Sequence, residues 1–76
     1  MTKEEWLSEF SDNLSSIMQD EGITQEELSS KSGVSKSAIS KYINWQQFPS
    51  FKAIVNLAYA LDCSTDDLID FGEPID

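Results

Sequence analysis

Histidine and arginine are both absent from this 76-residue chain, and Cys63 is its single cysteine. Cys63 cannot form an internal disulfide, and without histidine the chain has no credible set of zinc ligands. The absence of histidine also removes the usual general base, and so short a chain leaves little room for a substrate pocket beneath a packed core. We therefore expect no enzymatic activity, no catalytic residue, no metal, no cofactor and no small-molecule ligand.

Long apolar runs are missing as well. No stretch approaches the roughly 18 apolar residues that cross a bilayer, and the acidic N-terminus lacks the basic start of a signal peptide. Period-two runs of β-branched residues, internal repeats and low-complexity tracts are also lacking. The sequence therefore predicts one compact all-α domain over residues 1–76, located in the cytoplasm and without a membrane partner.

Acidic residues are missing from one continuous stretch of the chain. The formal net charge is -9, from 14 acidic and 5 basic residues, yet residues 28–61 contain no Asp or Glu. The same stretch holds Lys31, Lys36, Lys41 and Lys52. A local cationic surface can therefore form on an acidic protein, and such a surface attracts phosphates while the remainder of the molecule repels them.

Capping signals and helical spacing divide the chain into five helices. Thr2 and Thr24 open capping boxes, and the helices that follow end at Gly22 and near Ser32, before Gly33. A third helix is predicted over 35–43, a fourth begins at Ser50, and a short fifth begins at Ser64. Residues 44–49 form a loop, and we expect the tail 72–76 to fray unless it docks.

Apolar residues of the fourth helix form a wide stripe that we expect to be core: Phe51, Ile54, Val55, Leu57, Ala58 and Leu61. We expect Cys63 to act as a buried small hydrophobe rather than as a redox sensor, because no basic neighbour in the sequence would lower its pKa.

The second and third helices are short, and a tight turn around Gly33 and Val34 joins them, which is typical of a helix-turn-helix over residues 24–44. Ser29 is small where the two helices must pass closely, and Gly33 accepts the sharp turn. The third helix turns its apolar residues inward, namely Ile39, Tyr42 and Ile43. Its opposite face is polar or cationic and consists of Lys36, Ser37, Ser40 and Lys41.

The chain resembles the Cro and phage-repressor-like helix-turn-helix family, also called XRE-like. The resemblance lies in ITQEELSSKSGVSKSAISKYIN followed by PSFKAIVNLAYALDCSTDDLI, and covers about Leu14 to Ile69. It implies a compact five-helix, lambda-repressor-like DNA-binding fold. The chain departs from the family pattern at Ser29, where Ala is usual, at Trp45, where Gly is frequent, and at Gln46 and Gln47, where basic residues are common.

The resemblance also implies that the helix over 35–43 lies in the major groove of double-stranded DNA. Its candidate base-reading residues are Lys36, Ser37, Ser40 and Lys41. The candidate phosphate-binding residues are Gln25, Ser35, Asn44 and Lys52. The residue types agree, because lysine can donate to guanine and serine can donate or accept. An isolated helix with this face would be interpreted as simply solvated, but the surrounding motif and the missing acids favour DNA.

The calculated isoelectric point near 4.1 is unusual for a DNA-binding domain. We therefore expect weak, salt-sensitive non-specific affinity, and specific binding by a homodimer on a two-fold operator with half-sites about one helical turn apart. A repressor is favoured over an activator, because a bare DNA-binding domain can block polymerase. Trp45 has three open interpretations: a cover on the core edge, a contact to the DNA backbone, or a dimer contact.

An alternative function uses the same fold as a protein-interaction module, as in an antitoxin or an antirepressor-like factor. The two acidic flanks, residues 1–27 and 62–76, carry charges of -7 and -6 by residue count and would bind a basic partner. Charge reversal at Glu26 and Asp67 would then weaken partner capture, whereas Lys36→Ala would matter little.

Overall fold

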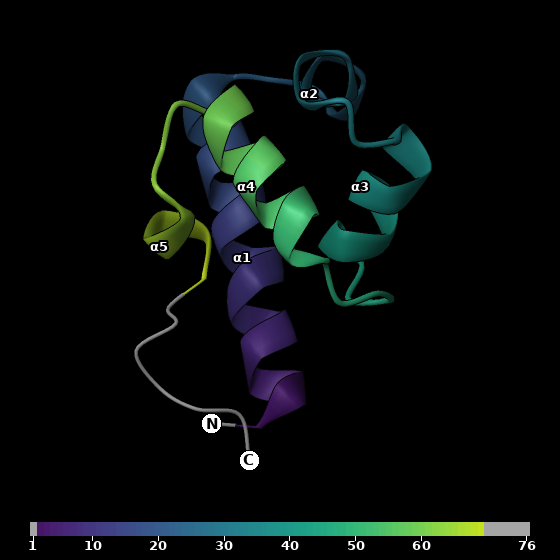
Figure 1. Ribbon diagram of the computed structural model, residues 1–76, viewed down its shortest axis with the longest axis vertical. Coiled ribbons are helices and arrows are strands. Elements are labelled where there is room, and N and C mark those ends of the chain that lie inside the picture. The colour runs from purple at the N-terminus through teal and green to yellow at the C-terminus, as the bar shows by residue number, and fades with distance from the viewer. Residues whose placement is uncertain (1, 70–76) are drawn as a thin grey trace.

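The computed structural model describes residues 2–69, and these form five helices. They are α1 (Lys3–Glu21), α2 (Gln25–Ser32), α3 (Lys36–Ile43), α4 (Phe51–Ala60) and α5 (Thr65–Leu68). The long α1 is contacted by α3 and α5, while α2 packs on α3 and α4, and α4 packs on α5 (Figure 1). No strand occurs within residues 2–69. The predicted all-α fold with five helices is confirmed.

Every helix begins at a hydroxyl side chain that accepts a hydrogen bond from the main-chain N–H three residues later. The capping residues are Thr2, Thr24, Ser35, Ser50 and Ser64. Thr2, Thr24 and Ser64 complete capping boxes, because a carboxylate three residues on accepts from the main-chain N–H of the cap. Each cap contributes about 1 kcal/mol to helix stability, and all five predicted helix starts are confirmed.

The core fills the space enclosed by α1, α2, α3, α4 and α5. Its largest fully buried apolar side chains are Phe10, Leu14, Leu28, Ile39, Leu57, Leu68 and Ile69. All five helices contribute to this one cluster, with Leu68 as the contribution of α5, and Ile69 follows directly after that helix. A chain of this size gains most of its stability from such a shared core.

Two contacts hold the C-terminal end of α3 against α1. The buried hydroxyl of Ser11 donates a short hydrogen bond to the main-chain carbonyl of Tyr42. The Phe10 and Tyr42 rings meet edge to face, with centroids 5.6 Å apart and an interplanar angle of 74°. On the other side of α1, the Asn13 side-chain amide donates to the carbonyl of Leu68 at 2.9 Å. The two contacts to Tyr42 position α3 on α1, and the contact to Leu68 positions α5 on α1.

The expected core stripe on α4 is wrong at two positions. Phe51 is 70% exposed and Val55 is 40% exposed. The buried face of α4 consists of Ala53, Ile54, Leu57 and Ala58. At about 100° per residue, position 55 lies on the side of α4 away from this face, whereas position 51 lies near its edge, in the first turn of the helix. The apolar residues of α4 are therefore divided between a buried face and an exposed face.

Cys63 is partly buried and packs against the core. Burial raises the pKa of its thiol, and the carboxylates of Asp67, Glu21 and Asp62 raise it further. This environment agrees with the expected hydrophobic role. Within residues 2–69, no helix combines the length and the apolar character that crossing a membrane requires. The tail 72–76, predicted to fray, lies outside the described residues.

We predict that Ser11→Ala lowers the free energy of unfolding by about 1 kcal/mol, because it removes a buried hydrogen bond to Tyr42. Denaturant unfolding followed by circular dichroism measures the change. The matched control is Ser15→Ala on the exposed side of α1, which should change stability by less than about 0.5 kcal/mol. Equal effects of the two substitutions would contradict the anchoring role of Ser11.

We predict that iodoacetamide alkylates Cys63 more slowly in the folded protein than in the unfolded chain between about pH 7 and pH 9, because partial burial and the raised thiol pKa reduce the reactive thiolate. The reaction can be followed by mass spectrometry with and without guanidinium chloride. A folded protein that reacts as fast as the unfolded chain would show that the thiol is not protected.

Candidate nucleic-acid interface

The turn between α2 and α3 depends on Gly33 and on the hydroxyl groups of Ser32 and Ser35. Gly33 adopts φ 76° and ψ 1°, and its main-chain N–H donates to the Ser29 carbonyl at 2.9 Å. A Cβ at Gly33 would meet no described atom within 4 Å, so glycine is needed for its backbone angle rather than for space. The Val34 N–H then donates to the Ser32 hydroxyl at 3.1 Å, and Ser35 opens α3.

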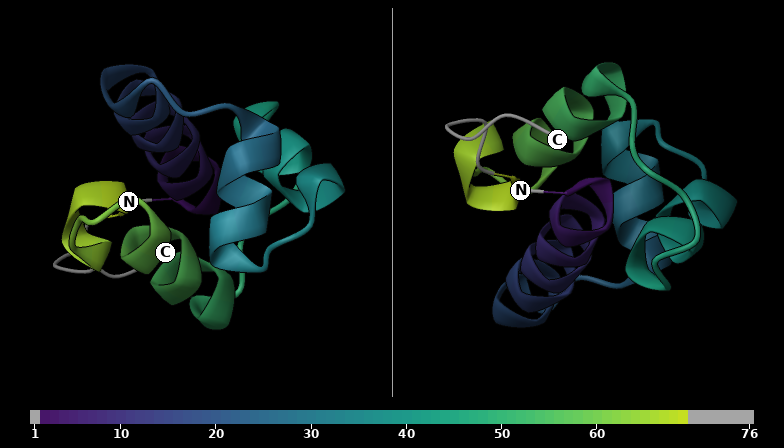
Figure 2. Two further views of the ribbon diagram at one scale, coloured as in Figure 1. Left: turned by 90° about the horizontal axis from the view of Figure 1, so that it is seen from above. Right: turned by 90° about the horizontal axis from the view of Figure 1, so that it is seen from below.

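Helix α3 has the two faces that its sequence predicts. Ile39 and Tyr42 are buried, and Ala38 and Ile43 pack partly against the core. The opposite face carries the predicted base-reading residues: Lys36, Ser37 and Lys41 are exposed, and Ser40 is half-buried. Figures 1 and 2 show α3 at one edge of the molecule, on the side away from α5. The four residues are therefore presented at the surface by one short helix.

The charges around α3 keep this face cationic. Neither α3 nor α4 contains an acidic residue. Among the described residues, Lys36 and Lys41 form no ion pair, so both ammonium groups are available to a ligand. Carboxylates within residues 2–69 therefore do not pair with the two lysines of this face.

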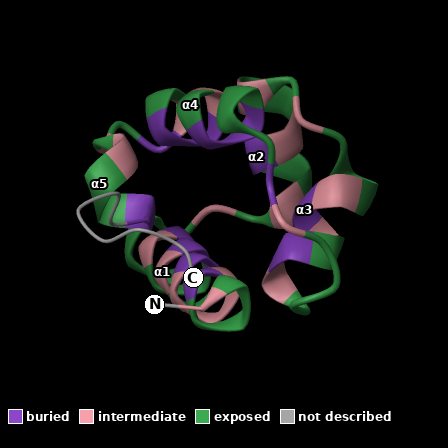
Figure 3. Cartoon of the chain, turned by 60° about the horizontal axis from the view of Figure 1, so that its bottom comes forward, coloured by how far each residue is buried: buried purple, intermediate pink, exposed green. Residues whose placement is uncertain are grey.

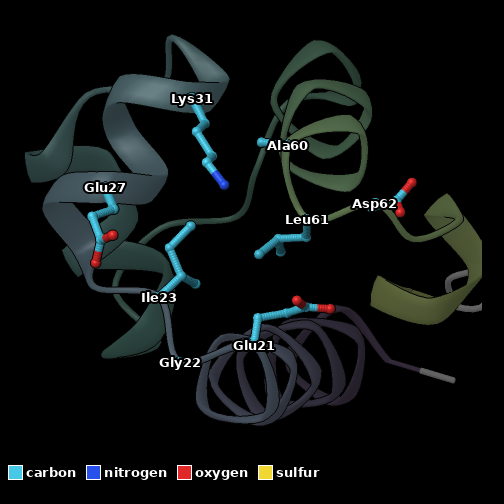
Figure 4. Close-up of a pocket in the computed structure, with 8 residues that line it drawn as sticks. All are labelled: Glu21, Gly22, Ile23, Glu27, Lys31, Ala60, Leu61 and Asp62. Carbon is cyan, nitrogen blue, oxygen red and sulfur yellow. The ribbon is translucent and has the colours of Figure 1, made fainter.

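Lys31 lies elsewhere, in an acidic groove between α2 and the C-terminal end of α4 (Figure 4). The groove has a volume of about 190 Å³, and its lining includes the acidic residues Glu21, Glu27 and Asp62. Hydrogen bonds from the main chain and side chain of Thr24 lower the pKa of Glu27, with a smaller contribution from Lys31. The charge of Lys31 is therefore offset locally and adds little to the α3 face.

Three of the predicted phosphate-binding residues lie at the N-terminal ends of helices. Gln25 is partly buried in the first turn of α2, beside Glu26 and Glu27. Ser35 is exposed, and its oxygen accepts from the Ala38 N–H at 3.1 Å, which leaves the hydroxyl hydrogen able to donate to a phosphate. Lys52 is exposed in the first turn of α4. Free main-chain N–H groups at such ends favour anions.

Asn44 has a structural role that the sequence did not reveal. Its side-chain amide donates to the Ser40 carbonyl at 2.9 Å and approaches the Ser40 hydroxyl at 3.4 Å, so it caps the C-terminal end of α3. Asn44 directly follows α3 and lies about one helical turn after Ser40, and this spacing at a helix end is the signal for such a cap. A phosphate would have to compete with these two contacts for the amide hydrogens of Asn44.

Trp45 ends α3 in a left-handed backbone conformation, with φ 61°. The N–H of Gln46 donates to the Lys41 carbonyl at 2.8 Å, and the N–H of Trp45 donates to the Tyr42 carbonyl at 3.3 Å, which is the hydrogen-bond pattern of a Schellman motif. Glycine is the usual residue at this position, because left-handed geometry costs other residues roughly 1–2 kcal/mol. The Trp45 side chain is 56% exposed, so it is no cover for the core edge.

Two short capped helices, a glycine turn and an acid-free outer face on the second helix together define a helix-turn-helix protein of the DNA-binding class. Residues 13–73 match the family model described as the Cro/C1-type HTH DNA-binding domain. This match spans most of the chain, so the protein belongs to that family and is a DNA-binding transcription regulator. The resemblance noted in the sequence is confirmed.

One solved structure that the chain is similar to is the restriction-modification controller protein C.AhdI from Aeromonas hydrophila. The two share 30% sequence identity with a TM-score of 0.79, over 83% of this chain and 96% of the controller protein. A comparison with curated proteins gives no match. The structural similarity extends over nearly the whole controller protein and therefore confirms the arrangement of the helices.

We predict that Trp45→Gly raises the free energy of unfolding by about 0.5–1 kcal/mol, because glycine removes the left-handed strain and Trp45 is not among the side chains packed against the core. Thermal and denaturant unfolding measure the gain. Asp62, at φ 54° after α4, is the matched position, and Asp62→Gly should gain less because aspartate tolerates this geometry better. A less stable Trp45→Gly variant would mean that the indole ring contributes packing that outweighs the strain.

Proposed function

We propose that this protein is a sequence-specific transcriptional repressor that reads the major groove of its operator with α3 as a homodimer. The observation that carries the proposal is the exposed, acid-free face of α3 on a molecule that is otherwise strongly anionic. An anionic protein approaches DNA favourably only through a surface where its own acids are absent. No enzymatic role is proposed, and we place the protein in the cytoplasm with the DNA that it regulates.

The proposed roles of the side chains follow from their positions. An α-helix with its side chains is about 10–12 Å in diameter, so α3 can enter a major groove about 12 Å wide. In this groove the base-reading residues are Lys36, Ser37, Ser40 and Lys41. The phosphate-binding residues are Gln25, Ser35, Asn44 and Lys52. Lysine is matched to guanine acceptors, whereas serine accepts several bases, so the lysines are expected to dominate sequence discrimination.

The net charge supports binding by two copies. With formal charge -9 and no arginine, one copy has few cations with which to release counterions from DNA, so a single half-site binds weakly. Two copies on a two-fold operator double the matched contacts, with half-sites about 34–36 Å apart. The similar solved protein is described as a restriction-modification controller, which supports a regulatory role. Repression needs only occupancy of a promoter by the bound dimer.

Selection of bound sites from random duplex DNA tests this function. We predict that it enriches an inverted repeat with half-sites about one helical turn apart. Affinity for the enriched duplex should fall with salt at a logarithmic slope of roughly -0.9 per phosphate contacted. Recovery of no enriched motif at either of two salt concentrations would contradict sequence-specific binding.

We predict that Lys41→Glu lowers affinity for the selected duplex by at least about a hundredfold, because it removes one base-reading or phosphate contact and adds a repelled charge at the interface. The helical circular-dichroism spectrum should be unchanged, since Lys41 is exposed. Lys3→Glu, an exposed charge reversal at the start of α1, is the matched control and should change affinity only a few-fold. Equal losses in the two variants would indicate a general charge effect rather than contact by α3.

The exposed acids favour a second candidate function, a protein-interaction module that binds a basic partner. Apart from Glu9, every acidic residue within residues 2–69 is exposed, and three of them border the groove around Lys31. Under this alternative, charge reversal at Glu26 and Asp67 weakens partner capture while Lys36→Ala has little effect. The reverse pattern, loss of binding to DNA only in the α3 variants, supports the regulator.

A further inference from the structure

The outer face of α4 carries exposed apolar side chains at helical spacing. Phe51, Val55 and Tyr59 lie four residues apart, and Tyr59 is 88% exposed. Residues at i and i+4 are neighbours on one side of a helix, so the three form one stripe along α4. Figure 3 shows this outer side of α4 as exposed, with the buried side of the same helix facing the core. Exposed apolar stripes of this kind mark interaction surfaces.

We infer that this stripe is the surface through which two copies of the protein associate. The inference deepens the proposed homodimer by naming its contact surface. It rests on the proposed function, but its own observation is the apolar outer face of α4, whereas that of the proposed function is the charge of α3. Experiments on the two surfaces therefore distinguish their failures.

Charge favours a second copy as the occupant. Every copy carries formal charge -9, so two copies repel each other through most of their surfaces. Among the five described helices, α3 and α4 alone lack acidic residues, and Lys52 is the only charged residue of α4. With α3 reserved for DNA, the outer face of α4 is the described helical surface on which two copies meet with least repulsion.

The area of the stripe fits a dimer contact. At their observed exposures, the side chains of Phe51, Val55 and Tyr59 present roughly 300–400 Å² per copy, about half of one side of a standard interface. Neighbouring polar residues would form the rim, as they do around other apolar interface centres.

Two-fold symmetry fixes which side chains meet. In an isologous contact, the residue at the centre of the stripe faces its own copy across the axis. Val55 is central, so an antiparallel crossing of two α4 helices brings Phe51 of one copy to Tyr59 of the other. In Figure 3, α3 lies to one side of the exposed face of α4, so a copy seated on α4 leaves α3 uncovered.

Sedimentation analysis of the full chain without DNA tests the surface. The wild-type protein should be a dimer, and Val55→Glu should raise the dimer dissociation constant by about a hundredfold or more, because it opposes two like charges on the axis. Ser15→Glu adds the same charge at an exposed position of α1 and should leave the dimer intact. Circular dichroism should show all three proteins equally helical, since Val55 and Ser15 both lie partly or wholly outside the core.

Cross-linking provides a second measurement that does not depend on weakening the dimer. In a Cys63→Ala background, Val55→Cys should cross-link to itself through a short bis-maleimide, whereas Ser15→Cys should not. A wild-type protein that stays monomeric up to roughly 100 µM, a Val55→Glu variant that dimerises like wild type, or a face that binds only another protein would each overturn the inference. Dimerisation through α4 without operator binding would instead refute the proposed function alone.

Discussion

Packing of Ile39 and Tyr42 against the core decides which side of α3 faces the solvent. The Ser11 hydroxyl and the Phe10 ring hold Tyr42 from the α1 side, and the left-handed Gly33 sets the angle at which α3 leaves α2. Because both ends of α3 are fixed in this way, Lys36 and Lys41 project together from one rigid surface. A binding face on a packed helix is held more accurately than one on a loop.

An acidic protein can have a DNA-binding fold when its acidic residues lie away from the recognition helix. Here they lie outside α3 and α4. Acidic residues are concentrated in α1, α2 and α5, where several of them cap helices or favour the positive end of a helix dipole. The helices that remain, α3 and α4, contain no acidic residue and carry the two proposed contact surfaces. Under the proposed function, the negative remainder would weaken non-specific attachment to DNA and raise the share of binding that depends on sequence.

The C-terminal end of α3 combines two local features with opposite effects. Asn44 stabilises the last turn by capping Ser40, whereas Trp45 occupies a left-handed position that favours glycine. A strained, half-exposed tryptophan beside the proposed recognition surface is the kind of residue that proteins retain for contact rather than for stability. Of its three interpretations, exposure excludes the core cover, and the two contact roles stay open as hypotheses.

The sequence by itself determined the helix starts, the glycine turn and the two faces of α3, because capping, left-handed geometry and helical spacing are local properties that neighbouring residues fix. It also identified the family, since the turn and the following helix lie close together in the chain. Only the tertiary structure decided the fate of the apolar residues of α4, where packing on α2 and α5 buries Ile54 and Leu57 and leaves Phe51 and Val55 outside. It also placed Lys31 in an acidic groove and Asn44 in a cap. These outcomes depend on the direction from which distant segments approach a helix, and no pattern within one helix records that direction.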